Sequence, residues 1–469
     1  MRKIVTMFML VATVASNAQN KEYAREFFLE EKVRDTQLRH LIESYIESPS
    51  QVNADAIDSY LDRRNTERAD DSLTGGAEPF IALHPTNNQL LALSYMESGG
   101  SFEYPVYYST DAGATWDRSN FSPVGVLNTE FPGDQVLGGG DPVLAFDEDG
   151  KLHMTWIYLH GQGFSFNAGM FYAYSSDGGQ TFTVPATDDH VIFDGTLLPT
   201  DMLDRQWMHV DNSGGPYDGN LYMSAIYFGG ALGGAGEVVM TKPADSTGFN
   251  MTPTIAVPIT GNEAAQFGNV KVDPNGTVHL SCMKFDSNGG AGGVYYTNST
   301  DGAQTFGTPV QVGTATTALP NSGNHLIHDR DNSATSMAVD GNNIYIAWSD
   351  MANNDVRGFF VHSNDGGTTF STPFEFGVDL LDSTYYHLMP NVAADNGKVS
   401  ISWYAVSKND FMTNYIVTES TDGGATFPTY SVVSSAPTDF GNEGSGFYGD
   451  YNTSVKDDCF TYAAWSDGR

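Results

Sequence analysis

The chain has 469 residues, of which 57 are acidic and 22 are lysine or arginine, so its formal net charge at pH 7 is -35. A surface this acidic repels nucleic acid and anionic membranes, which argues against a nucleic-acid-binding protein. With 50 glycines, 12% aromatic residues and only 17% charged residues, the composition is typical of a turn-rich, all-β protein.

The N-terminus has the features of a cleavable secretory signal. Residues 1–18 contain two cations, an apolar run from Ile4 to Val14, and a small-x-small ending at Ser16-Asn17-Ala18. This pattern predicts a signal peptide and a secreted, periplasmic or cell-surface protein. No later stretch approaches the roughly 20 apolar residues that a transmembrane helix needs, so we expect no membrane insertion. We also expect a monomer.

Residues 19–76 are predicted to form a helical N-terminal segment. Residues 21–68 lack glycine and are rich in charge, and Phe28, Val33, Leu41 and Ile46 fall near one stripe of a helix. A second helix fits residues 54–68. We expect the apolar stripe to pack against the domain that follows, with a partner-binding or removable pro-segment role as the alternative.

A short motif recurs along the rest of the chain. "SSDGGQTF", which begins at Ser175, returns in related form at Ser109, Ser299, Ser363 and Ser420, with the pattern Ser-x-Asp-x-Gly-x-Thr-aromatic. The one departure is Ala303 in place of glycine. The aspartate can accept hydrogen bonds from turn amides and glycine supplies a positive φ, so we interpret these aspartates as structural.

A second series of turns gives the period of the repeat. Each turn ends an alternating strand and precedes an apolar one. The residues that open these turns are His84, Asp147, Asp211, Asp273, Asp340, Asp395 and Lys456. Their spacings, 55 to 67 residues, accommodate four short strands per unit. The sequence therefore predicts a β-propeller over residues 77–469. A seventh copy of the motif would fall beyond Arg469, so we expect seven blades with the last incomplete, and a six-bladed ring is the alternative.

The repeated motif resembles the Asp-box, or bacterial neuraminidase repeat, of the sialidase-like propeller superfamily. The resemblance covers the chain from Glu78 onward. It implies that the boxes join the third and fourth strands of each blade, on the face away from the active site.

The channel mouth is the expected place for a ligand. Stepping six residues back from each turn residue gives one position per blade, and these positions are Glu78, Asp141, Arg205, Phe267, Ala334, Met389 and Asp450. Three acids and one arginine in this column are unexpected at a purely structural position. Neighbouring stretches add Trp207, Arg330, Tyr448 and Tyr451.

The resemblance implies a glycoside hydrolase of exo-acting, sialidase-like type that acts on extracellular glycans. Asp141 would be the acid/base catalyst, and Tyr448 or Tyr451 the nucleophile beside Asp450 or Glu443. A tyrosine suits an anomeric centre that already bears a carboxylate. Arg205 and Arg330 would bind that carboxylate, with Glu78 and Trp207 also contacting substrate. Sialidases have an Arg-Ile-Pro motif at the first strand, where this chain has "GAEPFIA".

Several alternatives remain open at this stage. The chain could act on another carbohydrate, or could be a non-catalytic propeller that binds carbohydrate or protein. The column could be structural, with Asp204, Arg205 and Asp450 in ion pairs and the other two acids capping loop amides. The aromatic side chains Trp207, Tyr448 and Tyr451, expected to be exposed, could stack on sugars in either an enzyme or a binding protein.

No organic cofactor is predicted. Structural calcium at the converging acids, near Asn269 and Asn391, is a weaker hypothesis, since no dense Asp-x-Asp-x-Asp loop accompanies them. Cys282 and Cys459 are the only cysteines, and we expect two buried free thiols rather than a disulfide.

Overall fold

The computed structural model describes residues 76–97, 102–163, 165–186, 189–196, 201–229, 236–261, 263–286, 292–315, 334–352, 355–377, 384–439 and 448–467. The predicted signal peptide, and all but the last residue of the predicted helical segment, lie outside these ranges. Within them, none of the helical structure is long and apolar enough to cross a membrane.

The described residues form antiparallel sheets in which successive strands pair in chain order. The first sheet contains β1(Gly76–Leu83), β2(Leu91–Glu97), β3(Val106–Ser109) and β4(Asp117–Arg118). The second contains β5(Gln135–Phe146), β6(Leu152–Gln162), β7(Ser165–Ser175) and β8(Val191–Thr196). The third contains β9(Met202–Val210), β10(Leu221–Phe228), β11(Gly236–Lys242) and β12(Thr254–Val257). One short helix in the described ranges, α5(Pro123–Glu130), links β4 to β5, and its N-cap Ser122 accepts a hydrogen bond from Gly125 N at 3.1 Å.

The remaining sheets follow the same plan. They are β13(Glu263–Val272), β14(Val278–Asp286), β15(Gly292–Ser299) and β16(Val310–Ala315); β17(Ser336–Asp340), β18(Asn343–Ala352), β19(Asp355–Ser363) and β20(Phe374–Phe376); β21(Tyr385–Asp395), β22(Lys398–Ser407), β23(Met412–Ser420) and β24(Tyr430–Val432), with β25(Thr438–Asp439) beside β23; and the pair β26(Thr453–Lys456) and β27(Thr461–Ala464).

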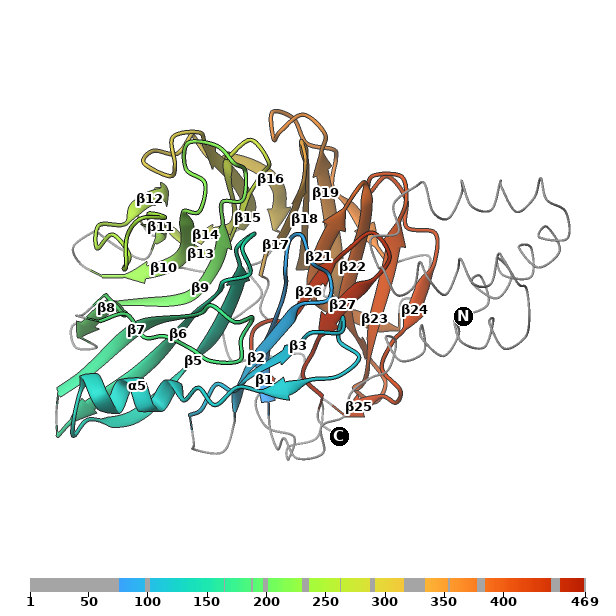
Figure 1. Cartoon of the computed structure of the whole chain (residues 1–469). Helices are drawn as coiled ribbons and strands as arrows, with labels where there is room; N and C mark the ends of the chain where they lie inside the picture. Colours follow the sequence, from blue (N-terminus) through green and yellow to red (C-terminus); the bar gives the residue numbers. More distant parts are fainter. Residues whose placement is uncertain are drawn as a thin grey trace, which may run out of the picture.

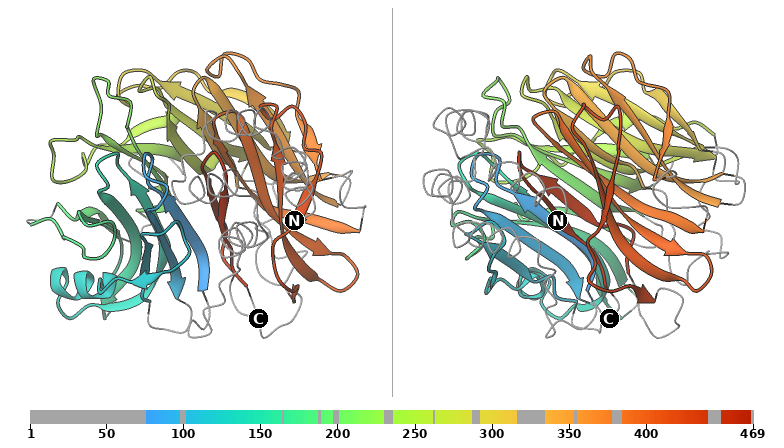
Figure 2. Two further views of the ribbon diagram at one scale, coloured as in Figure 1. Left: turned by 45° about the vertical axis from the view of Figure 1, so that its right-hand side comes forward. Right: turned by 90° about the vertical axis from the view of Figure 1, so that its right-hand side faces the viewer.

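The first strands of the sheets form a closed ring. Each lies beside the first strands of its neighbours, in the order β1, β5, β9, β13, β17, β21, β26 and back to β1. Blue β1 and red β26 and β27 accordingly lie side by side in Figure 1, and Figure 2 shows the sheets fanned around one another. At this junction Thr453 Oγ1 accepts a hydrogen bond from Ile81 N at 2.8 Å and donates to Pro79 O at 3.0 Å.

The molecule is therefore a β-propeller, as the sequence predicts. The six complete four-stranded blades agree with the six-bladed alternative. The two-stranded sheet β26–β27 lies where the sequence predicts an incomplete seventh blade.

The Asp-boxes are confirmed as structural turns between the third and fourth strands. In the box after β7, Asp177 Oδ1 accepts hydrogen bonds from Thr181 N at 2.8 Å and Ser175 Oγ at 2.7 Å, and Oδ2 accepts one from Thr181 Oγ1 at 2.6 Å. The same bonds recur at Asp111, Asp301, Asp365 and Asp422. These bonds lower the pKa of each of the five carboxyls. All five aspartates therefore stabilise the turns in which they lie.

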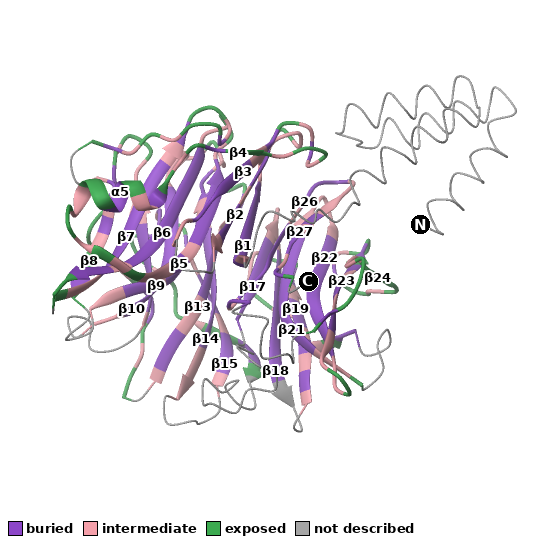
Figure 3. Ribbon diagram, turned by 90° about the horizontal axis from the view of Figure 1, so that it is seen from below, coloured by how far each residue is buried: buried purple, intermediate pink, exposed green. Residues whose placement is uncertain are grey.

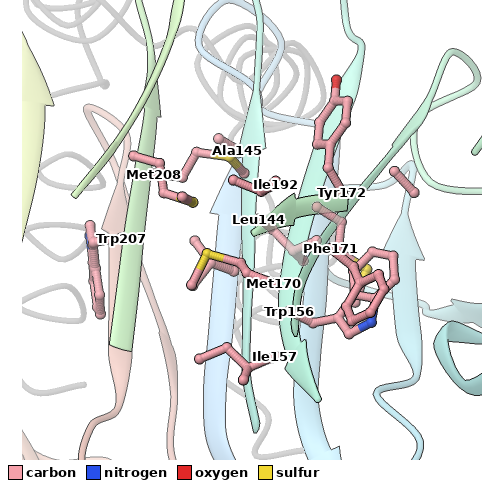
Figure 4. Packing of buried hydrophobic residues seen from close by; sticks show 14 of the residues in the cluster. Leu144, Ala145, Trp156, Ile157, Met170, Phe171, Tyr172, Ile192, Trp207 and Met208 are labelled. Carbon is pink, nitrogen blue, oxygen red and sulfur yellow. The ribbon is translucent and has the colours of Figure 1, made fainter. Parts of the chain in front are cut away.

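The hydrophobic core lies between adjacent blades. In Figure 4, Leu144 of β5 and Trp156 of β6 belong to the same cluster as Met208 of β9, from the next sheet. Figure 3 shows the resulting pattern, with buried residues along the strands and exposed ones at the loops and on α5. Burial of the apolar surface between the blades is the main favourable contribution to folding.

Both cysteines are free thiols, as expected. Cys282 is buried, but Cys459 is partly exposed, which corrects the expectation of two buried thiols. Cys459 lies in the turn between β26 and β27, where no further strand of that sheet covers it.

The Asp-box glycines allow a matched stability test. Gly366 and Gly367 both have positive φ, at 70° and 84°, but only at Gly367 would a Cβ overlap the ring of Tyr296. Gly366→Ala should destabilise by about 1 kcal/mol from backbone strain. Gly367→Ala should cost about 1–3 kcal/mol more, because the buried ring must move. Equal urea midpoints for the two variants would contradict this packing.

Candidate active site

The predicted column residues share one unusual backbone feature. In five first strands, two residues face a single residue of the second strand, which is a β-bulge. The first bulge residue has a positive φ in each case, namely Glu78 at 54°, Asp141 at 53°, Arg205 at 47°, Phe267 at 63° and Met389 at 49°. Non-glycine residues rarely adopt this conformation, and such bulges re-aim side chains and are common beside active sites.

The bulges are tied to the neighbouring blades. The carbonyl of Asp141 accepts a hydrogen bond from Gln206 Nε2, that of Phe267 one from Thr335 Oγ1 at 2.9 Å, and that of Met389 one from Asn452 Nδ2 at 2.7 Å. Each donor directly precedes or belongs to the first strand of the next blade. The strained backbone is thus held from outside its own sheet, as required for strain to persist.

The acids of the column come together at the mouth. Glu78 is buried, and its Oε1 accepts a hydrogen bond from Asp450 N at 3.2 Å, across the junction between the last sheet and the first. This bond is the amide capping that the structural interpretation expects of Glu78. Asp141 and Asp450 are each partly exposed, so both remain accessible from the mouth.

The carboxyl of Asp141 has a raised pKa. Removal from bulk water, together with the negative charges of Asp204 and Asp450, raises its pKa to about 7 against the opposing effects of Arg205 and Tyr451. A carboxyl with this pKa is substantially protonated at neutral pH and can donate a proton.

Arg205 is a buried cation among aromatic rings. Its guanidinium lies 4.7 Å from the ring centroid of Phe267, 5.5 Å from Tyr451 and 5.7 Å from Trp207. Among the described residues, Nε and Nη1 have no hydrogen-bond partner. The ion pairs that the structural interpretation assigns to Arg205 are therefore not observed in this part of the chain.

Sequence reasoning missed a fourth acid, Glu237 of β11. It is fully buried, and burial raises its pKa to about 8 against the opposing charge of Arg205. Its carboxyl lies so close to the backbone of Gly268, the second bulge residue of β13, that a Cβ there would overlap it. Glu237 thus supports the bulge of the next blade.

The aromatic candidates are buried rather than exposed. Trp207 packs edge-on against Phe80 and Tyr451, with ring centroids 4.9 Å and 5.6 Å away. Tyr451 lies beside Asp141, and burial and nearby acids raise its pKa. The Tyr448 hydroxyl donates instead to Asp439 O at 3.4 Å. The expectation of exposed rings is wrong, because adjacent blades cover both faces of the inner strands. Glu443 and Arg330 lie outside the described residues.

The structure gives the calcium hypothesis no support. In the described ranges, no three His, Cys, Asp or Glu side chains are arranged to hold a metal ion. Asn391 Oδ1 accepts hydrogen bonds from Ser454 N and Oγ, each at 2.8 Å.

Comparison with known proteins agrees with the repeat. Residues 107–118 match the BNR/Asp-box repeat family. No curated protein matches the sequence. The described residues thus form a β-propeller that carries Asp-box repeats.

Several solved structures are similar to this chain at low sequence identity. An alpha-L-arabinanase of Penicillium chrysogenum is 14% identical with a TM-score of 0.47, over 75% of this chain and 94% of that one. The GH93 alpha-L-arabinofuranosidase of Fusarium graminearum is 14% identical with a TM-score of 0.45, over 71% and 88%. A protein of unknown function from Dyadobacter fermentans is 13% identical with a TM-score of 0.44, over 73% and 94%. Similarity at this level says nothing about activity.

The raised pKa of Glu237 predicts a pH-dependent stability difference. Folded Glu237 keeps its proton up to about pH 8, whereas in the unfolded chain this carboxyl loses its proton near its ordinary pKa of 4.5. The folded state therefore binds more protons in this window, and this group's contribution falls as pH rises. Glu237→Gln should become progressively more stable, relative to the unaltered chain, between pH 5 and pH 8.

Urea unfolding at pH 5, 6.5 and 8 measures this difference. Glu148→Gln, at an exposed turn residue, is the matched control and should follow the unaltered chain. Parallel curves for Glu237→Gln and the unaltered chain would show that Glu237 is ionised in the fold.

Proposed function

We propose that this chain is an exported enzyme that hydrolyses glycosidic bonds of extracellular glycans, with its active site at the channel mouth. The observation that carries the proposal is the pairing of a partly exposed acid of raised pKa, Asp141, with the buried, partly unpartnered cation Arg205. An acid for the leaving group and a donor for an anionic substituent are two of the groups that cleavage of an acidic sugar needs, beside a nucleophile.

Arg205 selects the substrate class. Its Nε and Nη1 atoms are buried without a hydrogen-bond partner among the described residues, and leaving such donors unsatisfied costs free energy. A carboxylate on the sugar would satisfy them by charge-assisted hydrogen bonds, and the three surrounding rings exclude water from this contact. A sialic acid or another sugar acid therefore fits the site better than a neutral sugar.

Asp141 is the proposed general acid. Its side chain is partly exposed, and a pKa of about 7 lets it hold a proton that it can pass to the glycosidic oxygen. The leaving sugar departs as an alcohol, and Asp141 becomes the carboxylate.

Tyr451 is the better supported of the two nucleophile candidates. Its hydroxyl lies beside Asp141, whereas that of Tyr448 bonds to Asp439. Burial and the nearby charges raise the pKa of Tyr451, so attack requires a base to take the phenol proton. Glu78 and Asp450, which meet at the last junction of the ring, are the proposed groups for that step.

The dependence on leaving group tests the role of Asp141. An alcohol leaving group needs protonation, whereas an activated phenol does not. Asp141→Asn should thus lower kcat/KM by about 10² to 10⁴ for a natural disaccharide linkage, and much less for an aryl glycoside of the same sugar. In the unaltered enzyme kcat/KM should fall above about pH 7, as Asp141 ionises.

The assay uses sialosides, uronides and neutral glycosides with both kinds of leaving group. Arg205→Ala should lose activity on the acidic sugars, while Arg118→Ala, at an exposed arginine, should retain it. Equal losses on both leaving groups in Asp141→Asn would remove Asp141 from the acid role. No hydrolysis of any glycoside, with glycan binding that depends on Arg205, would show a non-catalytic binding propeller.

A further inference from the structure

A channel between the first strands contains two basic side chains. Its volume is about 330 Å³, and residues of β1, β5, β9, β13, β17, β21 and β26 line it. His209 of β9 and Lys271 of β13 are among them. Each follows the positive-φ residue of its strand by four positions, where β1 and β5 have the lining residues Ala82 and Ala145. The small side chains leave room opposite the two bases.

Lys271 has no counter-charge. Among the described residues it makes no ion pair, although the chain has 57 acidic residues. Burial alone lowers its pKa to about 8, so the ammonium remains largely charged at neutral pH. Burial and the charge of Lys271 lower the pKa of His209 to about 3, which leaves its imidazole neutral.

Asp273, Asp340 and Asp395 line the channel, and the first two are engaged in turns. Asp273 Oδ1 accepts hydrogen bonds from Asn275 N at 2.8 Å and Thr277 N at 2.9 Å. Asp340 Oδ2 accepts one from Gly397 N at 2.6 Å. The carboxylates of Asp273 and Asp340 thus accept hydrogen bonds from turn amides. Neither forms an ion pair with Lys271.

Amide groups lie on the mouth side of Lys271. Asn269 and Asn391 occupy equivalent positions, two residues after the positive-φ residues Phe267 and Met389, and both line the channel. Because the Asn391 oxygen accepts from Ser454, its NH₂ group is left to donate. An ammonium and a carboxamide donor facing one cavity suit a small anion.

We propose that the channel binds a small monovalent anion, chloride or a short carboxylate, through the ammonium of Lys271 beside Asn269 and Asn391. An unpaired ammonium that is only partly exposed to water is costly, and a bound anion offsets that cost. The cavity has room for an anion with several waters, since a water occupies roughly 30 Å³. Asp141, Arg205 and Tyr451 do not line this channel, so the anion site does not depend on the proposed activity.

Thermal unfolding at pH 6.5 and constant ionic strength tests the proposal. Replacing gluconate, which is too large for tight contact, by chloride or formate should raise the Tm of the unaltered chain saturably by a few degrees. Lys271→Met should abolish the rise. Lys284→Met, which removes a lysine paired with Glu263 at 3.0 Å, should keep it. A larger rise in Tm with chloride or with formate identifies which class of anion the channel binds.

Crystals of the unaltered chain soaked in bromide give a second measurement. This measurement tests anion binding in the channel even if Lys271→Met fails to fold. The expected result is an anomalous peak in the channel next to Lys271 Nζ. Equal Tm responses in the unaltered chain and Lys271→Met, or bromide peaks only on the outer surface, would overturn the proposal.

Discussion

The positive-φ bulge in the first strand is the constraint on which the mouth of this propeller depends. An ordinary strand would send successive side chains alternately into the two neighbouring blades. The bulge interrupts that alternation at the same place in five blades and supplies Glu78, Asp141 and Arg205 to one region from separate sheets. Without it, each of these polar groups would face an apolar interface between blades.

The closed ring stabilises the strained backbone of the bulges. A non-glycine residue at positive φ costs about 1 kcal/mol or more, and several lie within one annulus. Cross-blade hydrogen bonds from Gln206, Thr335 and Asn452 hold the bulge carbonyls, and Glu237 supports the bulge at Gly268. The Asp-boxes lie at the opposite ends of the blades, where they fix the hairpins between the third and fourth strands.

The sequence predicted the repeat and the column, because both depend on local patterns that recur in phase. It did not predict the bulges, although a signal was present. Pro79, Pro142 and Pro390 directly follow three column residues, and proline inside a strand marks an edge or a bulge. The role of Glu237 could not be predicted from the sequence, because it depends on contact with Gly268 in the next blade. The burial of Trp207 and Tyr451 was missed for the same reason, as neighbouring blades cover them.

The central claim is that the mouth keeps one carboxyl, Asp141, protonated near neutral pH. Carbon-13 NMR of aspartate-labelled protein, with Asp141→Asn to assign the signal, measures this directly. We predict a titration of Asp141 with a pKa of about 7. A value near that of a solvated aspartate would contradict both the desolvated mouth and the acid role assigned to this residue.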